Sequence, residues 1–196
     1  KTLLALVTIT VAAGFTIRLF AEKPTVHAMK AISRTLLGPL YVGFLLCHAI
    51  LLREKIPQGT FFLFLAVACT FLSDTGAMFG GMVFGRHPLA PTVSPKKTIE
   101  GGVLGVLTGP PSALAVQAVF SSLGGEAQFS TGHLLLLGFL IGVASLVGDL
   151  VESLCKRDAG VKDSGVFFPG HGGVLDRLDS LLFSIPMTYY YVVFVG

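Results

Sequence analysis

The stretch from Gly148 to Ser180 carries the densest group of ionisable side chains in the sequence. Only 13% of the 196 residues are charged, so a cluster of carboxylates, lysines, arginines and a histidine stands out. Side chains of both signs gathered in this way suit the binding of metal ions and phosphates. The cluster consists of Asp149, Glu152, Lys156, Arg157, Asp158, Lys162, Asp163, His171, Asp176, Arg177 and Asp179.

Several of these carboxylates are spaced to share helix faces. Asp149, Ser153 and Lys156 have the spacing i, i+4, i+7, and Asp176 and Asp179 are three residues apart. If their helices approach each other, the aspartates could hold one or two hard cations through oxygen. Magnesium suits such a site, because it takes one or two protein carboxylates and completes its shell with water and substrate phosphates. The alternative is structural, since carboxylates are common at helix starts.

A glycine-rich segment, PGHGG, lies between these two helices and includes His171, Gly172 and Gly173. Glycines let backbone N–H groups approach an anion closely, and a helix N-terminus follows, so the segment is a candidate phosphate site. Taken alone, it would be a flexible turn. The basic residues around it favour the phosphate interpretation: Lys156, Arg157, Lys162 and Arg177.

A second basic loop occupies residues 85–100 and contains the sequence SPKKT. Its Lys96 and Lys97, with two hydroxyl groups, could clamp a polyphosphate or a lipid phosphate just before a glycine-rich helix start. The alternative is an ordinary basic loop attracted to anionic lipid. Asp74 lies in an apolar stretch, where a carboxylate is costly unless it faces a partner, a cation or water.

Composition indicates that lipid surrounds most of the chain. Hydrophobic residues make up 53% of the sequence, and the mean hydropathy is +0.79. We therefore predict an all-α, polytopic transmembrane protein with about six spans. The spans are expected at about 3–20, 35–52, 60–84, 101–121, 131–153 and 178–195. Residues 1–59 form N-terminal helices peripheral to the site, and 60–196 form the catalytic region with loops 85–100 and 154–177.

The distribution of charge predicts the orientation. With alternating spans, most lysines and arginines fall on the side that carries loops 21–34, 85–100 and 154–177, whereas the opposite loops hold only Arg53 and Lys55. The basic side is then cytoplasmic, which puts the candidate site where nucleotides and magnesium are available. We expect a bacterial-type inner membrane. No basic stripe with interleaved aromatic residues points to nucleic acid.

The sequence shows no spacing typical of a Ser/His/Asp nucleophile and base. Neither is needed if one phosphate attacks another, because a second phosphate pKa of about 6 leaves the nucleophile largely ionised at neutral pH. Catalysis would then depend on alignment of the reactants and on neutralisation of a leaving pyrophosphate.

The charged stretch closely resembles the signature of the phosphatidate cytidylyltransferase family, also called CDP-diacylglycerol synthases. The blocks SDTGAMFGG and SPKKTIEG resemble its other two landmarks, whereas Cys155 replaces a larger residue usual in the family. The chain begins at Lys1 without Met, and the family has further spans before this region, so we expect truncation at the N-terminus. The matching signature positions are Ser153, Lys156, Arg157, Lys162, Asp163, Gly165, Phe168, Pro169, His171, Gly172, Gly173, Asp176, Arg177 and Asp179.

The resemblance implies a magnesium-dependent reaction of CTP with phosphatidate that yields CDP-diacylglycerol and pyrophosphate. By position, Asp149 and Asp176 are the metal ligands. The resemblance also implies a homodimer and a potassium ion as a second cation. The other catalytic positions are Asp74, Lys97, Lys156, Arg157, His171 and Asp179, and the substrate-binding positions are Lys96, Lys162, Gly172, Gly173 and Arg177.

Two other classes fit part of the pattern. A transporter would use Asp74, Asp149 and Glu152 as an intramembrane cation pathway, but this leaves the basic, glycine-rich loops unexplained. A lipid phosphotransferase that uses a CDP-alcohol would concentrate its acids in a single DGxxAR-type motif, which the sequence lacks.

Overall fold

The computed structural model describes residues 2–21, 27–125, 129–165 and 173–195. The chain forms two compact units, Lys1–Cys47 and His48–Gly196. The larger unit contains every described candidate site residue. The two units divide between Cys47 and His48, whereas the sequence places the start of the catalytic region at residue 60. The functional assignment of the two parts stays a prediction.

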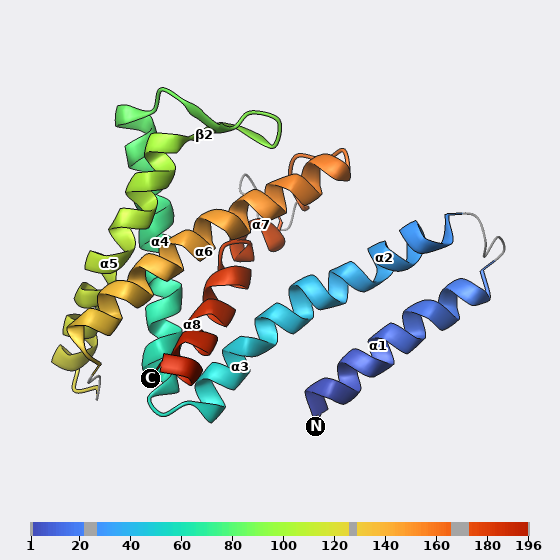
Figure 1. Ribbon diagram of the computed structural model, residues 1–196, viewed down its shortest axis with the longest axis horizontal. Coiled ribbons are helices and arrows are strands. Elements are labelled where there is room, and N and C mark those ends of the chain that lie inside the picture. The colour runs from blue at the N-terminus through green and yellow to red at the C-terminus, as the bar shows by residue number, and fades with distance from the viewer. Residues whose placement is uncertain (1, 22–26, 126–128, 166–172, 196) are drawn as a thin grey trace. The chain divides into compact units, whose positions relative to one another are not determined.

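The smaller unit consists of apolar helices. Helix α1 (Thr2–Leu19) lies beside α2 (Ala28–Gly38), which continues into a π-helical turn, η1 (Pro39–Phe44) (Figure 1). The next helix, α3 (Leu45–Lys55), begins in this unit and belongs to the larger unit from His48 on. The π turn begins at Pro39, which has no N–H to donate to the helical ladder. The three segments together form one continuous helix over Ala28–Lys55.

The larger unit is a group of long helices (Figure 1). Its elements are α4 (Gly59–Phe84), α5 (Ile99–Ser122), α6 (Thr131–Asp158), α7 (Leu175–Leu178) and α8 (Leu181–Val195). Helix α5 packs along α4 on one side and along α6 on the other, and α8 contacts both α4 and α6. This arrangement brings α4, α5 and α6 together although loops separate them in the sequence.

A short antiparallel hairpin joins α4 to α5. Its strands are β1 (Pro88–Ala90) and β2 (Ser94–Thr98), paired with Pro88 opposite Thr98 and Ala90 opposite Ser94. Helix α5 begins directly after β2, and the Thr98 side chain accepts a hydrogen bond from the backbone N–H of Gly101. The sequence predicted only a basic loop here, so the hairpin is an addition to the all-α fold.

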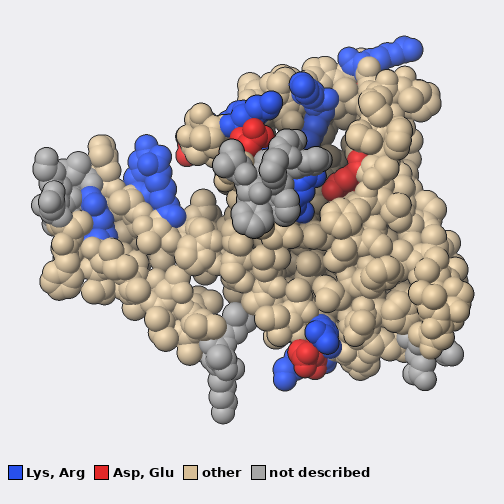
Figure 2. Space-filling view, turned by 180° about the vertical axis from the view of Figure 1, so that it is seen from behind, with Lys and Arg blue, Asp and Glu red and all other residues tan. Residues whose placement is uncertain are grey.

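The prediction of a polytopic helical membrane protein is confirmed. Among the described residues, five helices are long and apolar enough to cross a membrane, and Ala5–Leu19 is a shorter apolar helix. The five are Ala28–Lys55, Gly59–Phe84, Ile99–Ser122, Thr131–Asp158 and Leu175–Val195, close to the expected spans. In Figure 2, the visible charges of the larger unit gather toward its upper and lower ends, with an uncharged band between them.

Glycines set the close approach of α5 to α6. A Cβ atom on Gly138 would lie 2.5 Å from the carbonyl oxygen of Gly109, and one on Gly109 would likewise meet the Gly138 backbone. In lipid, where helices gain little from the hydrophobic effect, such contact between small residues supplies much of the packing energy. Leu137 and Ile141, which flank Gly138 on α6, belong to an apolar core that also includes Phe61.

We expect Gly138→Ala to lower the thermal unfolding midpoint of the protein in detergent. The new methyl group would overlap backbone atoms of α5 and force the helices apart, at a cost of about 1–3 kcal/mol. Gly132→Ala is the matched control on the same helix, because its Cβ would meet nothing closer than the Ser130 hydroxyl at 3.9 Å. Equal midpoints for the two variants would contradict the role of Gly138.

Candidate functional site

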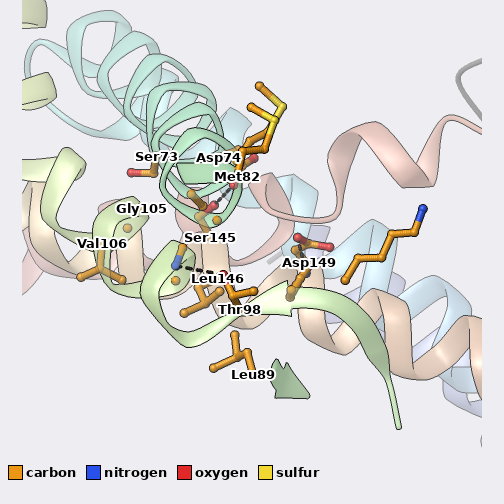
Figure 3. A pocket seen from close by; sticks show the side chains of 18 residues that line it. Ser73, Asp74, Met82, Leu89, Thr98, Gly105, Val106, Ser145, Leu146 and Asp149 are labelled. Atoms are coloured by element: carbon orange, nitrogen blue, oxygen red, sulfur yellow. Dashed lines mark hydrogen bonds and ion pairs between the residues drawn. The ribbon is translucent and has the colours of Figure 1, made fainter. Parts of the chain in front are cut away.

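The predicted site residues of separate sequence blocks meet at one pocket in the larger unit. The cavity has a volume of about 460 Å³ and lies among α4, β2, α5 and α6. Asp74, Ser145 and Asp149 lie around it together with apolar side chains (Figure 3). The polar side chains that line the cavity are Ser73, Asp74, Lys96, Lys97, Thr98, Ser145 and Asp149.

An ion pair joins the hairpin to α6. The Lys97 ammonium, from β2, contacts Oδ2 of Asp149, and these side chains are 22% and 33% exposed respectively. A partly buried pair of this kind offsets the cost of holding each charge at the membrane boundary. The contact places one predicted phosphate-binding lysine directly against one predicted metal ligand.

Asp74 is held by hydroxyl groups. The Ser145 hydroxyl on α6 donates to Oδ1 of Asp74 over 2.6 Å, and the Ser180 hydroxyl lies 3.5 Å from the same oxygen. Both serines are almost fully buried. The dashed line at Asp74 in Figure 3 marks the contact with Ser145. Asp74 therefore ties α4 to α6 and to the turn before α8.

Asp179 is brought beside Asp149 by a glycine contact. A Cβ on Gly148 would lie 2.6 Å from the carbonyl oxygen of Asp179 and 3.1 Å from Cα of Ser180, so only glycine allows this approach. Asp179 accepts a hydrogen bond from the Ser180 backbone N–H over 2.7 Å. Its carboxylate also interacts electrostatically with those of Asp149, Glu152 and Asp74.

A second ionic group lies one to two turns further along α6. The Lys156 ammonium is 2.5 Å from Oε2 of Glu152 and 2.7 Å from Oδ1 of Asp176. The Glu152 side chain is fully buried, and the Lys156 and Asp176 side chains are 16% and 11% exposed. The sequence predicted that Lys156 contacts substrate phosphate; in the structure it neutralises two carboxylates.

Asp176 also organises the loop before α7. Its Oδ2 accepts hydrogen bonds from the backbone N–H and hydroxyl of Ser164, over 2.8 and 2.7 Å, and from the N–H of Gly173 over 2.7 Å. One carboxylate thereby holds both Ser164 and Gly173. His171 and Gly172, predicted to contact substrate, lie outside the described residues.

The remaining predicted basic residues occupy different positions. Arg157 donates from Nε to the carbonyl of Val93 over 3.2 Å, and from Nη1 to that of Val161 over 3.3 Å, so it fastens the hairpin to the end of α6. Lys96 lines the pocket. Lys162 and Arg177 are exposed beyond α6 and on α7.

Sequence reasoning missed the residues that support the site. Glu100 accepts hydrogen bonds from the backbone N–H groups of Arg86 and His87, and lies 2.6 Å from Nδ1 of His87. It therefore closes the base of the hairpin. The signal for Glu100 was an acid in the first turn of a helix after a threonine cap. Ser145 gave no signal, because serine is common in transmembrane helices.

The carboxylate oxygen atoms near the pocket fit a magnesium site in part. Asp74, Asp149 and Asp179 supply hard oxygen atoms, and Lys97 is the cation paired with Asp149. Within the described ranges, however, no three histidine, cysteine or acidic side chains are grouped closely enough to hold a metal ion. A magnesium ion would therefore rely on water and substrate phosphates for most of its ligands, as it usually does.

Comparisons with known proteins show which proteins this chain is similar to. Residues 1–195 match the family described as "Cytidylyltransferase family". A phosphatidate cytidylyltransferase of Synechocystis is 39% identical over 201 residues, which cover 87% of this chain and 65% of that protein. The Bacillus subtilis phosphatidate cytidylyltransferase is 38% identical over 154 residues, 79% of this chain and 55% of that protein. The chain thus spans about two thirds or less of the length of these relatives.

A plant protein extends the similarity. Phosphatidate cytidylyltransferase 4, chloroplastic, from Arabidopsis thaliana is 44% identical over 120 residues, which cover 61% of this chain and 29% of that protein.

We expect Lys156→Met to destabilise the protein by about 3–5 kcal/mol, because it leaves the buried Glu152 carboxylate without its cation. The double variant Glu152→Gln, Lys156→Met removes both charges and should regain most of the lost stability. Denaturant unfolding in mild detergent measures both. If the double variant is no more stable than Lys156→Met, the ion pair is not what holds this end of α6.

Proposed function

The chain belongs to the cytidylyltransferase family, and on this premise we propose that it makes CDP-diacylglycerol and pyrophosphate from CTP and phosphatidate. The observation that carries the proposal is a pocket lined by Asp74, Lys97 and Asp149, which come from three separate sequence blocks. An enzyme that joins a nucleotide to a lipid needs such a polar pocket within apolar helices.

Lysines at the pocket would bind the triphosphate. Lys96 and Lys97 follow each other on β2, and both line the cavity. Lys97 would pass from the Asp149 carboxylate to a phosphate oxygen when CTP enters. The ammonium groups would then neutralise the pyrophosphate that leaves, and charge stabilisation of this kind is the main source of catalysis in phosphoryl transfer.

The lipid phosphate would act as the nucleophile. One of its oxygens forms a bond to the α-phosphorus of CTP, and the bond between that phosphorus and the bridging oxygen of the β-phosphate breaks. The electron pair leaves with pyrophosphate. No protein base is required, because the phosphate is largely ionised at neutral pH. The protein contributes alignment of two strongly charged groups that would otherwise repel each other.

Acidic residues would hold a metal at the same site. Asp149 and Asp176 are the predicted ligands, and Asp179, which lies beside Asp149, is a further oxygen donor. Asp176 accepts contacts at both oxygens here, so its use as a ligand requires exchange of some of them. Bound magnesium would neutralise negative charge on the triphosphate. A potassium ion as second cation belongs to the same proposal.

The setting of the reaction follows from the basic loops. We propose that the pocket faces the cytoplasm of a bacterial-type inner membrane, because the hairpin and the end of α6 carry most of the basic residues near the site. A homodimer is part of the proposal through the family resemblance alone. Membership of this family disfavours the transporter and the CDP-alcohol phosphotransferase.

The first test is incorporation of radiolabelled CTP into chloroform-soluble lipid by the purified protein, supplied with phosphatidate. With magnesium we expect labelled lipid and an equal amount of pyrophosphate, and with EDTA neither. If magnesium supports no labelled lipid, the proposed reaction is wrong for this chain, and ion flux in sealed vesicles becomes the next measurement.

We expect Asp149→Asn to lower the rate of label incorporation by at least about 100-fold, since it removes a charge at the centre of the pocket. Asp158→Asn is the control, because Asp158 ends the same helix and is exposed. Circular dichroism should show equal helix content for both. An Asp149→Asn rate close to that of the control would remove Asp149 from the catalytic machinery.

A further inference from the structure

A second, apolar cavity of about 280 Å³ adjoins the polar pocket. Its own walls are Ile99, Val103 and Leu107 from α5 and Phe139 from α6. Among the described residues, only apolar side chains and Gly102 line it. The cavity is suited to hydrocarbon, because an apolar chain needs no hydrogen-bond partner there.

The two cavities share a wall. Leu89, Gly102, Val106 and Leu146 line both of them. In Figure 3, Leu89, Val106 and Leu146 lie along one side of the polar pocket, away from Asp74. A ligand whose polar end occupies the first cavity can therefore extend its apolar part into the second without leaving the protein surface.

Gly102 lies at the junction. A Cβ atom there would be 3.3 Å from Cδ2 of Leu146 and 3.5 Å from Cδ2 of Leu89. The two leucine side chains thus approach each other over a residue that has no side chain. A larger residue at position 102 would fill the space between the polar and apolar cavities.

The apolar cavity runs along helix α5. Ile99, Val103 and Leu107 are four residues apart on one face of α5, so they span about 12 Å of helix axis. Ile99 is next to the hairpin that carries Lys97, and Leu107 lies further into the span. One leaflet of hydrocarbon is about 15 Å thick, half of the bilayer core. The side chains are about half exposed, at 46%, 52% and 56%.

We propose that this groove, formed by residues 99–107 of α5 with Phe139, Leu146 and Leu89, binds one acyl chain of the lipid whose phosphate enters the polar pocket. The assignment rests on the proposed function for the identity of that lipid. It gives the apolar side chains of α5 a role in substrate binding: they hold the chain while the lysines of β2 hold the head group. The groove could instead be covered by a transmembrane helix of another chain, or by any bilayer lipid regardless of its head group.

The test uses a phosphatidate with a diazirine in one acyl chain, added without CTP to the protein in phosphatidylcholine nanodiscs. After illumination, mass spectrometry should find adducts in 99–107 and 139–146. Unlabelled phosphatidate should displace the label, whereas the same amount of additional phosphatidylcholine should not. Adducts elsewhere, or equal displacement by both lipids, would overturn the proposal.

Val103→Phe supplies a variant that narrows the groove. We expect adduct formation in the groove to fall about tenfold. The larger side chain would displace about two methylene groups of the acyl chain from the groove, and the lost burial lowers the affinity by about that factor. Val119→Phe is the matched control, because Val103 and Val119 are both 52% exposed on α5 and only Val103 lines the groove. If Val103→Phe does not fold, Leu107→Trp replaces it. Unchanged labelling in the folded variant would contradict the proposal.

The labelling separates this proposal from the proposed reaction. Head-group-dependent adducts in the groove, without incorporation of CTP into lipid, would keep the acyl-chain site and refute the reaction. Incorporation of CTP with adducts only outside the groove would keep the reaction and refute the acyl-chain site.

Discussion

Carboxylates at membrane depth must be matched by partners, and this constraint organises the larger unit. Four acids of this unit find a partner on another segment or another turn: Asp74, Asp149, Glu152 and Asp176. Asp74 takes hydroxyls from α6 and the turn before α8, Asp149 takes Lys97 from the hairpin, and Glu152 shares Lys156 with Asp176. Because a bare charge in hydrocarbon is costly, these contacts determine which segments meet.

The same contacts explain how a polar pocket persists among apolar helices. Small residues let the helices come close enough for short side chains such as serine and aspartate to reach each other across them. Gly148 brings Asp149 beside Asp179, and Gly109 with Gly138 fixes the crossing of α5 and α6. The glycine contacts hold the helices close together, and the ionic contacts place charged side chains at the pocket.

The hairpin contributes side chains to both the polar pocket and the apolar cavity. Its strand β2 carries Lys96 and Lys97 into the pocket, and Leu89 of β1 lines both cavities. Glu100 fastens the base of the hairpin and Arg157 fastens its turn to α6. In this arrangement Arg157 acts on the position of the lysines, while its predicted contact with phosphate stays a prediction.

The sequence by itself determined the membrane-spanning helices, the charged stretch and the family. Hydropathy alone predicts the spans, because a helix that crosses lipid needs about 20 apolar residues, whichever helices it packs against. The tertiary structure alone decided the partner of each acid, since Lys97 and Asp149 meet only when the hairpin folds onto α6. It also decided the hairpin and the apolar groove, which depend on how the helices pack and are not encoded in any local pattern.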